Sequence, residues 1–129
     1  MPPQALMPDG TLVSVTGYKT PLVTFTDPLG NTRLSVADPD TLVNASVNAL
    51  YNASVIARND ATNNVVTYSI GLGGVGAAED ELLRRIANDP VSPDYNSNRP
   101  EGLYIYAPTA LDLNMAFQRI ASEILLIAK

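Results

Sequence analysis

The sequence predicts an α/β fold in which a short β-ribbon precedes helices that alternate with parallel strands. The first indication is the run Val65 to Ile70, which is β-branched and aromatic and stops at three glycines in four residues. A strand that is buried on both faces and ends in a tight loop has this pattern. Residues Glu79 to Ala87 follow at once, with acids first, bases later and an apolar stripe, which predicts a helix folding back over the sheet.

Composition limits the possible functions. The chain has 129 residues, enough for one domain with its own core, and it contains no cysteine or histidine. This composition excludes disulfides, most zinc sites and any catalytic pair of serine or cysteine with histidine. The net charge is -5 and the eight basic residues are scattered, so we expect no nucleic-acid partner. The start lacks the pattern of a signal peptide, and no stretch approaches the ~20 apolar residues of a membrane helix, so we expect a soluble chain with no membrane segment.

Residues 1–38 are expected to form an arm and a β-ribbon. Residues 1–10 carry three prolines and a closing Asp-Gly, which indicates a disordered or draped arm. Three β-type runs then follow, separated by turn sequences: Thr11 to Thr16, Leu22 to Thr26 and Thr32 to Val36. Their spacing predicts a small antiparallel ribbon or meander.

The first helix begins after Asp38, because an Asp at the N-cap followed by Pro39 and a further acid is a strong start signal. It should run to about Arg58. Its apolar face carries Leu42, Ala45, Ala49, Ala53 and Ile56. The row Asn44, Asn48 and Asn52 is interpreted as a solvated face, so Asn48→Ala should be neutral or slightly stabilising. Asn44 and Asn52 also head glycosylation sequons, but a helix interior is a poor acceptor site.

The remaining elements follow from local signals. Asn59 to Asn64 is a turn cluster, and Asn88 to Gly102 is a polar, proline-rich surface loop. Leu103 to Tyr106 is a short strand, expected to run parallel to the strand at Val65. Thr109 stands three residues before Asp112, which predicts a capping box at the start of the last helix. The apolar stripe of that helix is Leu113, Phe117, Ile120, Ile124 and Ile127.

Several patterns suggest chemistry, but each has a stronger structural interpretation. The loop Gly71 to Gly76 lies between a strand and a helix, where backbone amides can bind phosphate. Its glycine spacing matches no nucleotide motif, and the acids Glu79, Asp80 and Glu81 would repel an anion. Those three acids point in different directions on a helix, so they do not predict a cation site.

Two further candidates are equally weak. Tyr104 and Tyr106 share one face of a strand, where packing is the simpler role. Asp27 follows a β-type run, but a single carboxylate is no metal site. The sequence therefore predicts no catalytic residue, no cofactor and no metal ligand.

Four segments in order resemble a known family: Val66 to Gly74, Asp80 to Pro90, Gly102 to Pro108, and Leu113 with Ala116 to Ile124. They are similar to the C-terminal half of a von Willebrand factor type A (VWA) domain. The nearest likeness is the bacterial TadE/TadG-like group of Tad pilus-assembly proteins. The resemblance covers about residues 40–129 and implies that residues 39–129 form half of a doubly wound, Rossmann-like sheet. It also implies a non-enzymatic adhesion or assembly role at the cell envelope or outside the cell.

Complete members of this family hold a Mg²⁺-type ion for a partner's carboxylate, and this chain departs from them there. The family's Asp-x-Ser-x-Ser motif is absent, and Thr26-Asp27-Pro28 is only a faint echo of its Thr-Asp-Gly motif. We therefore expect a truncated domain without the metal site, acting as a protein-interaction module. The alternatives are a nonfunctional fragment of a larger VWA protein and an anion or nucleotide binder using Gly71 to Gly76.

A truncated sheet has one further consequence. The strand at Val65 to Ile70 would lack its neighbour on one side, leaving unpaired backbone groups. We expect Leu22 to Thr26 to cover that edge, or a second chain to add a strand there and cause self-association.

Overall fold

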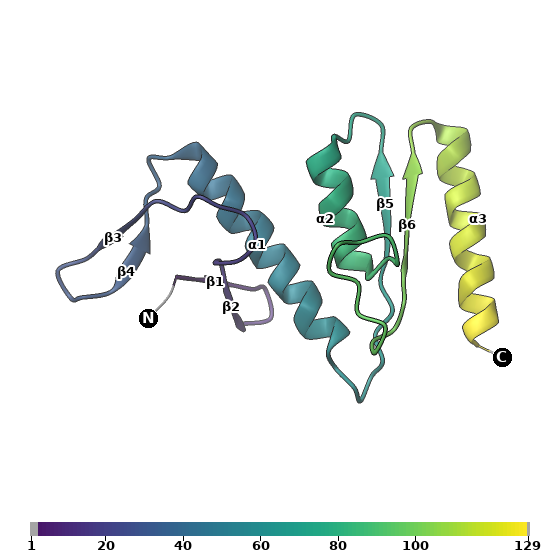
Figure 1. The fold of residues 1–129 in the computed structure, drawn as a ribbon, viewed down its shortest axis with the longest axis horizontal. Helices are drawn as coiled ribbons and strands as arrows, with labels where there is room; N and C mark the ends of the chain where they lie inside the picture. Colours follow the sequence, from purple (N-terminus) through teal and green to yellow (C-terminus); the bar gives the residue numbers. More distant parts are fainter. Residues whose placement is uncertain (1–2, 129) are drawn as a thin grey trace. The chain divides into compact units, whose positions relative to one another are not determined.

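The computed structural model describes residues 3–128 and has a mixed α/β architecture. Over these residues it contains three helices and three sheets of two strands each (Figure 1). The chain divides into two compact units, Met1–Ile56 and Ala57–Lys129. Most of the first helix therefore groups with the N-terminal hairpins, whereas the expected division placed that helix with the C-terminal part.

Two β-hairpins of the same design form the start of the N-terminal unit. β1 (Gln4–Leu6) pairs with β2 (Leu12–Ser14), and β3 (Thr24–Thr26) pairs with β4 (Thr32–Leu34), both antiparallel. Each turn has a proline in its second position and a left-handed glycine, Gly10 or Gly30, in its fourth. In each, that glycine's amide donates to the carbonyl at the start of the turn at 2.9 Å. Glycine at this position is typical of short hairpin loops.

The expected arm is therefore wrong for the described part of residues 1–10, and Met1 and Pro2 lie outside the described residues. Residues Gln4 to Leu6 form a strand because β2 supplies its hydrogen-bonding partners, a contact that three prolines nearby conceal in the sequence. The three expected β-type runs also do not form one continuous meander. They divide between two separate two-stranded sheets.

Helix α1 (Pro39–Arg58) begins where the sequence predicts. The Asp38 carboxylate accepts from the amides of Asp40 at 3.0 Å and Thr41 at 3.2 Å, the expected N-cap. The core of the N-terminal unit is small: Val15, Ala45 and Ala49 are buried, with Ala5, Leu22 and Leu34 packed against them. Two residues of the expected apolar face, Leu42 and Ile56, are exposed.

The asparagine row of α1 is not a solvated face. Asn48 is completely buried (0% exposed), and its amide group makes three hydrogen bonds to the segment 14–23, which we call the strap. Its Nδ2 donates to the carbonyl oxygens of Val15 and Lys19, each at 3.0 Å, and its Oδ1 accepts from the Lys19 amide at 2.9 Å. Gly17 passes so close that a Cβ there would lie 3.1 Å from Asn48 Oδ1.

The other members of the row bind the strap in the same way. Asn52 donates to the carbonyl oxygens of Ser14 (2.8 Å) and Thr16 (2.9 Å), and Asn44 donates to that of Pro21 (3.0 Å). The expectation of a solvated row is thus wrong, because these amides satisfy backbone groups that the strap does not pair within a sheet.

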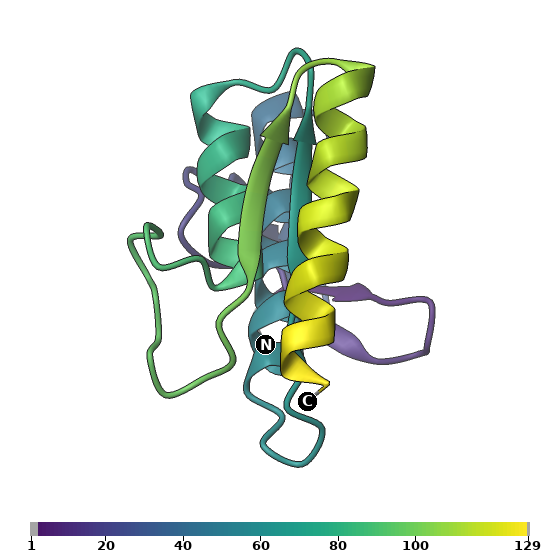
Figure 2. The same cartoon turned by 90° about the vertical axis from the view of Figure 1, so that its right-hand side faces the viewer.

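The C-terminal unit is a three-layer arrangement. β5 (Tyr68–Leu72) and β6 (Leu103–Ala107) form a parallel pair, as expected. Helix α2 (Ala77–Ala87) lies on one face of this pair and α3 (Ala110–Ile127) on the other, as Figures 1 and 2 show together. The expected capping box at the start of α3 is present, since Thr109 and Asp112 bond to each other's backbone amides.

The first strand of the pair is displaced from its expected position. The sequence predicts a strand at Val65 to Ile70, but β5 starts at Tyr68 because Tyr68 pairs with Leu103, where β6 itself begins. At its other end β5 includes Gly71, which pairs with Tyr106 and lies against the Tyr104 side chain, where a Cβ would collide with the Tyr104 hydroxyl. The limits of β5 are therefore set by its partner strand rather than by its own composition.

The loop between α2 and β6 is anchored by buried polar side chains. Asn88 ends α2 in a left-handed conformation, and its Nδ2 donates to the carbonyl oxygens of Asn96 (3.0 Å) and Pro100 (3.1 Å). Asp89 accepts from the Tyr104 amide at 3.1 Å, which ties the start of the loop to β6. Although the loop is polar, as predicted, part of it is interior.

Candidate functional site

The Gly71–Gly76 loop is occupied by the chain's own groups. A Cβ on Gly76, the N-cap of α2, would lie 2.8 Å from a Glu79 carboxylate oxygen, so a carboxylate already lies against the start of this helix. A Cβ on Gly73 would lie 3.0 Å from the Pro108 carbonyl oxygen. The geometry leaves the α2 N-terminus complemented by an acid of its own chain, which disfavours phosphate binding there.

The other two acids of this turn have structural partners. Asp80 accepts a hydrogen bond from the Tyr104 hydroxyl, and Glu81 pairs with Arg85 at 3.4 Å. The Arg84 guanidinium lies 4.7 Å from the centre of the Tyr104 ring. Burial, together with the Asp80 carboxylate, raises the pKa of Tyr104 to about 12. The three acids point to different partners, and Tyr104 packs between α2 and the sheet.

Asp27 is the capping residue of the β3–β4 turn. Its Oδ1 accepts from the backbone amides of Asn31 and Leu29, both at 2.9 Å, and its Oδ2 accepts from Arg33 Nε at 2.9 Å. Its pKa is lowered to about 2, mainly by the hydrogen bond from the Asn31 amide. These donors use the oxygen atoms that a cation would need.

Within residues 3–128 there is no group of three or more acidic side chains placed to hold a metal ion. None of the helices in that range is both long and apolar enough to cross a membrane.

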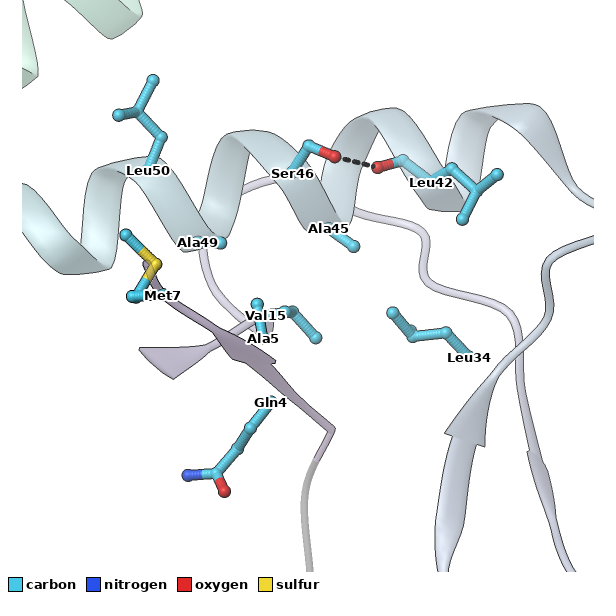
Figure 3. A pocket seen from close by; sticks show the side chains of 10 residues that line it. All are labelled: Gln4, Ala5, Met7, Val15, Leu34, Leu42, Ala45, Ser46, Ala49 and Leu50. Carbon is cyan, nitrogen blue, oxygen red and sulfur yellow. Dashed lines mark hydrogen bonds between the residues drawn. The ribbon is translucent and has the colours of Figure 1, made fainter. Parts of the chain in front are cut away.

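An apolar groove of about 470 Å³ lies in the N-terminal unit (Figure 3). Val15 and Leu34 line it from the strand side, and the α1 residues Leu42 and Leu50 lie along its helical wall. No ionisable side chain lines it, and the hydroxyl of its one serine, Ser46, donates to the Leu42 carbonyl at 2.8 Å. The groove therefore contains no group able to act as a nucleophile with an adjacent base.

The most distinctive surface of the C-terminal unit is the apolar side of α3. The residues of this helix that are buried or half-buried against the sheet include Leu113, Ala116 and Ile120. Three members of the predicted stripe are instead exposed: Phe117 (57%), Ile124 (50%) and Ile127 (62%). The stripe is wider than the two-stranded sheet that it covers, so part of it remains in solvent.

Phe117 and Ile124 lie with two exposed alanines on a separate line along the helix. Phe117, Ala121, Ile124 and Ala128 are all exposed and follow a 4-3-4 spacing, and we call them the α3 seam. Successive residues of an α-helix are about 100° apart, so the seam lies roughly 80° round the helix from the sheet-facing residues. The sequence shows this spacing, but it does not show how wide the sheet is. From the sequence alone, Phe117 and Ile124 are therefore predicted to be core residues.

The charges of α3 lie away from the seam. The ionisable residues of this helix are Asp112, Arg119 and Glu123. By helical geometry Asp112 and Arg119 fall on the opposite flank, whereas Glu123 is half-buried near Tyr68. Leu126 lies on that charged flank too and is 63% exposed. A helix whose second apolar line is free of charge has the pattern of a helix that packs against a further element.

The seam adjoins an open edge of the sheet. Val66, Tyr68, Ile124, Ile127 and Ala128 line a groove of about 380 Å³, which we call the α3–β5 groove. No residue of β6 contributes to it, and the groove lies where the end of α3 meets the start of β5. Burial and the nearby Glu123 carboxylate raise the pKa of Tyr68.

No described strand pairs with the outer edge of β5. The expected cover by Leu22 to Thr26 is not seen, because β3 pairs with β4 and the β5 sheet contains β6 alone. From Val65 to Val75 the chain carries no Asp, Glu, Lys, Arg or Pro, the residues with which proteins normally protect such an edge. The groove shares Ile124 and Ala128 with the seam and Tyr68 with β5, so it connects the seam to this strand.

No protein-family model, curated protein or solved structure matches this chain.

Proposed function

We propose that this chain is a non-enzymatic protein-interaction module whose binding surface is the α3 seam with the α3–β5 groove and the open edge of β5. The observation that carries this proposal is the charge-free line Phe117, Ala121, Ile124 and Ala128 beside β5, a strand that is paired on one edge only. Fully burying a Phe or Ile side chain contributes about 1.5–3 kcal/mol. With two such side chains half-exposed, the surface offers roughly 2 kcal/mol from these residues alone.

The proposal includes the family resemblance. We infer a relationship to the C-terminal half of the VWA domain in bacterial pilus-assembly proteins of the TadE/TadG-like group, with a role at the cell envelope or outside the cell. A parallel strand pair with one helix on each face is compatible with part of a doubly wound sheet. We propose that the chain lacks the family's metal site, since Asp27 serves the turn between β3 and β4.

Site-directed crosslinking in cells that express the full chain tests this function. The chain has no cysteine, so a single Ala121→Cys substitution places the only thiol on the seam, where a photo-activated thiol crosslinker can be attached. Ser122→Cys is the matched control, because residue 122 is also exposed but lies about 100° further round the helix. We expect a discrete covalent adduct from position 121 that Ile124→Lys abolishes. Equal labelling from both positions, or no adduct from position 121, would contradict a binding role for the seam.

A further inference from the structure

We infer that the seam and the β5 edge bind a second copy of this chain in an antiparallel, two-fold symmetric dimer. This inference rests on the proposed interaction function and names its partner. A partner for this surface must supply an extended strand beside β5 and an apolar helix beside α3. The chain itself carries both, next to each other.

The order of side chains along the seam is self-complementary. Phe117, Ala121, Ile124 and Ala128 alternate large and small, and their 4-3-4 spacing is the same in both directions. When a copy of α3 runs antiparallel, Phe117 therefore meets Ala128 of the copy, and Ala121 meets Ile124 of the copy. Each large side chain faces a small one, which is the condition for close helix packing.

Strand addition at β5 gives the same symmetry. Pairing β5 with its copy in the antiparallel direction produces a continuous four-stranded sheet and keeps both α3 helices on one face. The two-fold axis then lies near Tyr68 and Ser69 in the strand and between Ala121 and Ile124 in the helix. These levels agree, because Tyr68 and Ile124 line the same groove.

The charge distribution permits this contact. The chain has a net charge of -5, so two copies repel each other unless their charged groups lie outside the interface. The seam itself carries no ionisable residue, and Asp112 and Arg119 fall on the far flank of α3, whereas Glu123 is half-buried near Tyr68. An isologous interface requires one surface to be complementary to itself, and this surface meets that requirement in shape and charge.

Sedimentation equilibrium on the full chain tests the dimer. We expect the wild-type protein, of 13.7 kDa, to associate to twice that mass as concentration rises. Ile124→Lys should weaken the association at least about tenfold, since an unpaired charge would be buried at the interface. Leu126→Lys, on the charged flank of the same helix, should leave it unchanged. A wild-type protein that stays monomeric up to about 1 mM, or two lysine variants of equal effect, would overturn the inference.

A size exchange tests the antiparallel register. Ala121→Ile should weaken the dimer because it places a large side chain against Ile124 of the copy. Adding Ile124→Ala should restore it, since each large residue again faces a small one. Both positions are exposed, so folding can be checked separately by thermal denaturation. A double variant no tighter than Ala121→Ile would contradict this register.

Hydrogen exchange tests whether β5 takes part in the dimer contact, and crosslinking tests whether another polypeptide binds the same surface. Amides of residues 65–72 should gain protection as the dimer forms, and dimerisation without that gain would refute strand addition. A monomeric chain that still crosslinks another polypeptide at Ala121→Cys would refute the dimer and leave the proposed interaction function standing.

Discussion

Asn48→Ala should destabilise the N-terminal unit by about 2–3 kcal/mol. The substitution removes three hydrogen bonds, leaving the Val15 carbonyl and both backbone groups of Lys19 without partners. A buried backbone group without a partner costs about 1–3 kcal/mol. The Lys19 groups cost less than this because Lys19 is half-exposed and water can reach it. The better helix propensity of alanine returns at most about 0.7 kcal/mol.

Thermal denaturation followed by circular dichroism measures this loss, and a fall in Tm on the order of 10 °C is expected for a unit of this size. Trypsin cleavage after Lys19 gives a local readout, because release of the strap exposes that bond. The matched control is Asn44→Ala, a half-buried position with a single hydrogen bond to the strap, which should change stability by less than about 0.5 kcal/mol. An Asn48→Ala protein as stable as the wild type would show that this row is solvated and that the strap does not dock on α1.

Three further outcomes follow from local geometry. Gly102→Ala should prevent folding of the C-terminal unit, because its Cβ would lie 1.9 Å from the Thr67 carbonyl oxygen. Gly30→Ala, in open space at φ +83°, should lower the stability by only about 1 kcal/mol. Soluble yield and Tm distinguish the two variants. The pKa of Tyr104 is about 12 in the folded protein, so the stability that its neutral hydroxyl contributes is complete below about pH 10 and is lost as the pH rises toward 12. Ultraviolet titration should show one tyrosine that ionises late, and Tyr104→Phe should remove that step. Calorimetric titration with Mg²⁺, Mn²⁺ or Ca²⁺ should show no saturable micromolar site at Asp27, because the Asp27 carboxylate already accepts hydrogen bonds within its own turn. A saturable site that Asp27→Ala abolishes would contradict this.

Elements that are specified by neighbouring residues could be predicted from the sequence. The start of α1 at Asp38 and the capping box of Thr109 with Asp112 depend on groups only a few residues apart, and both form as expected. The parallel pairing of β5 and β6 follows from the helix between them. These are contacts whose geometry one stretch of sequence can fix.

Features that depend on a distant partner could not be predicted. An asparagine row on a helix looks the same whether water or another segment accepts its hydrogen bonds, and only the strap distinguishes the two cases for Asn48. Strand β1 has too few residues to be recognised without β2. The repeated turn design, with proline and glycine in the same positions around Gly10 and Gly30, was the available signal for this hairpin.

The same limit applies to the candidate binding surface. The apolar stripe of α3 was predicted correctly as a pattern, but the sequence does not state how wide the sheet beneath it is. Phe117 and Ile124 therefore read as core residues, although the two-stranded sheet leaves both of them exposed. Ala121 and Ala128 have no distinguishing feature until the helix is placed beside β5.

Because α1 binds the strap through side chains while the strap contributes main-chain atoms, substitutions should be tolerated better in the strap than in the asparagine row of α1. Asn44, Asn48 and Asn52 contact main-chain atoms of residues 14–21, so the identity of most strap side chains does not enter the interaction. Ser14, Thr16 and Lys19 should accept many replacements. Gly17, which passes against Asn48, and the core residues Val15 and Leu22 are constrained by size. A one-residue insertion in the strap would have the opposite effect, because the carbonyl groups would fall out of step with the turns of the helix. A library varying Ser14, Thr16 and Lys19 at constant strap length should therefore yield mostly folded proteins, which makes these three positions suitable for introducing new side chains.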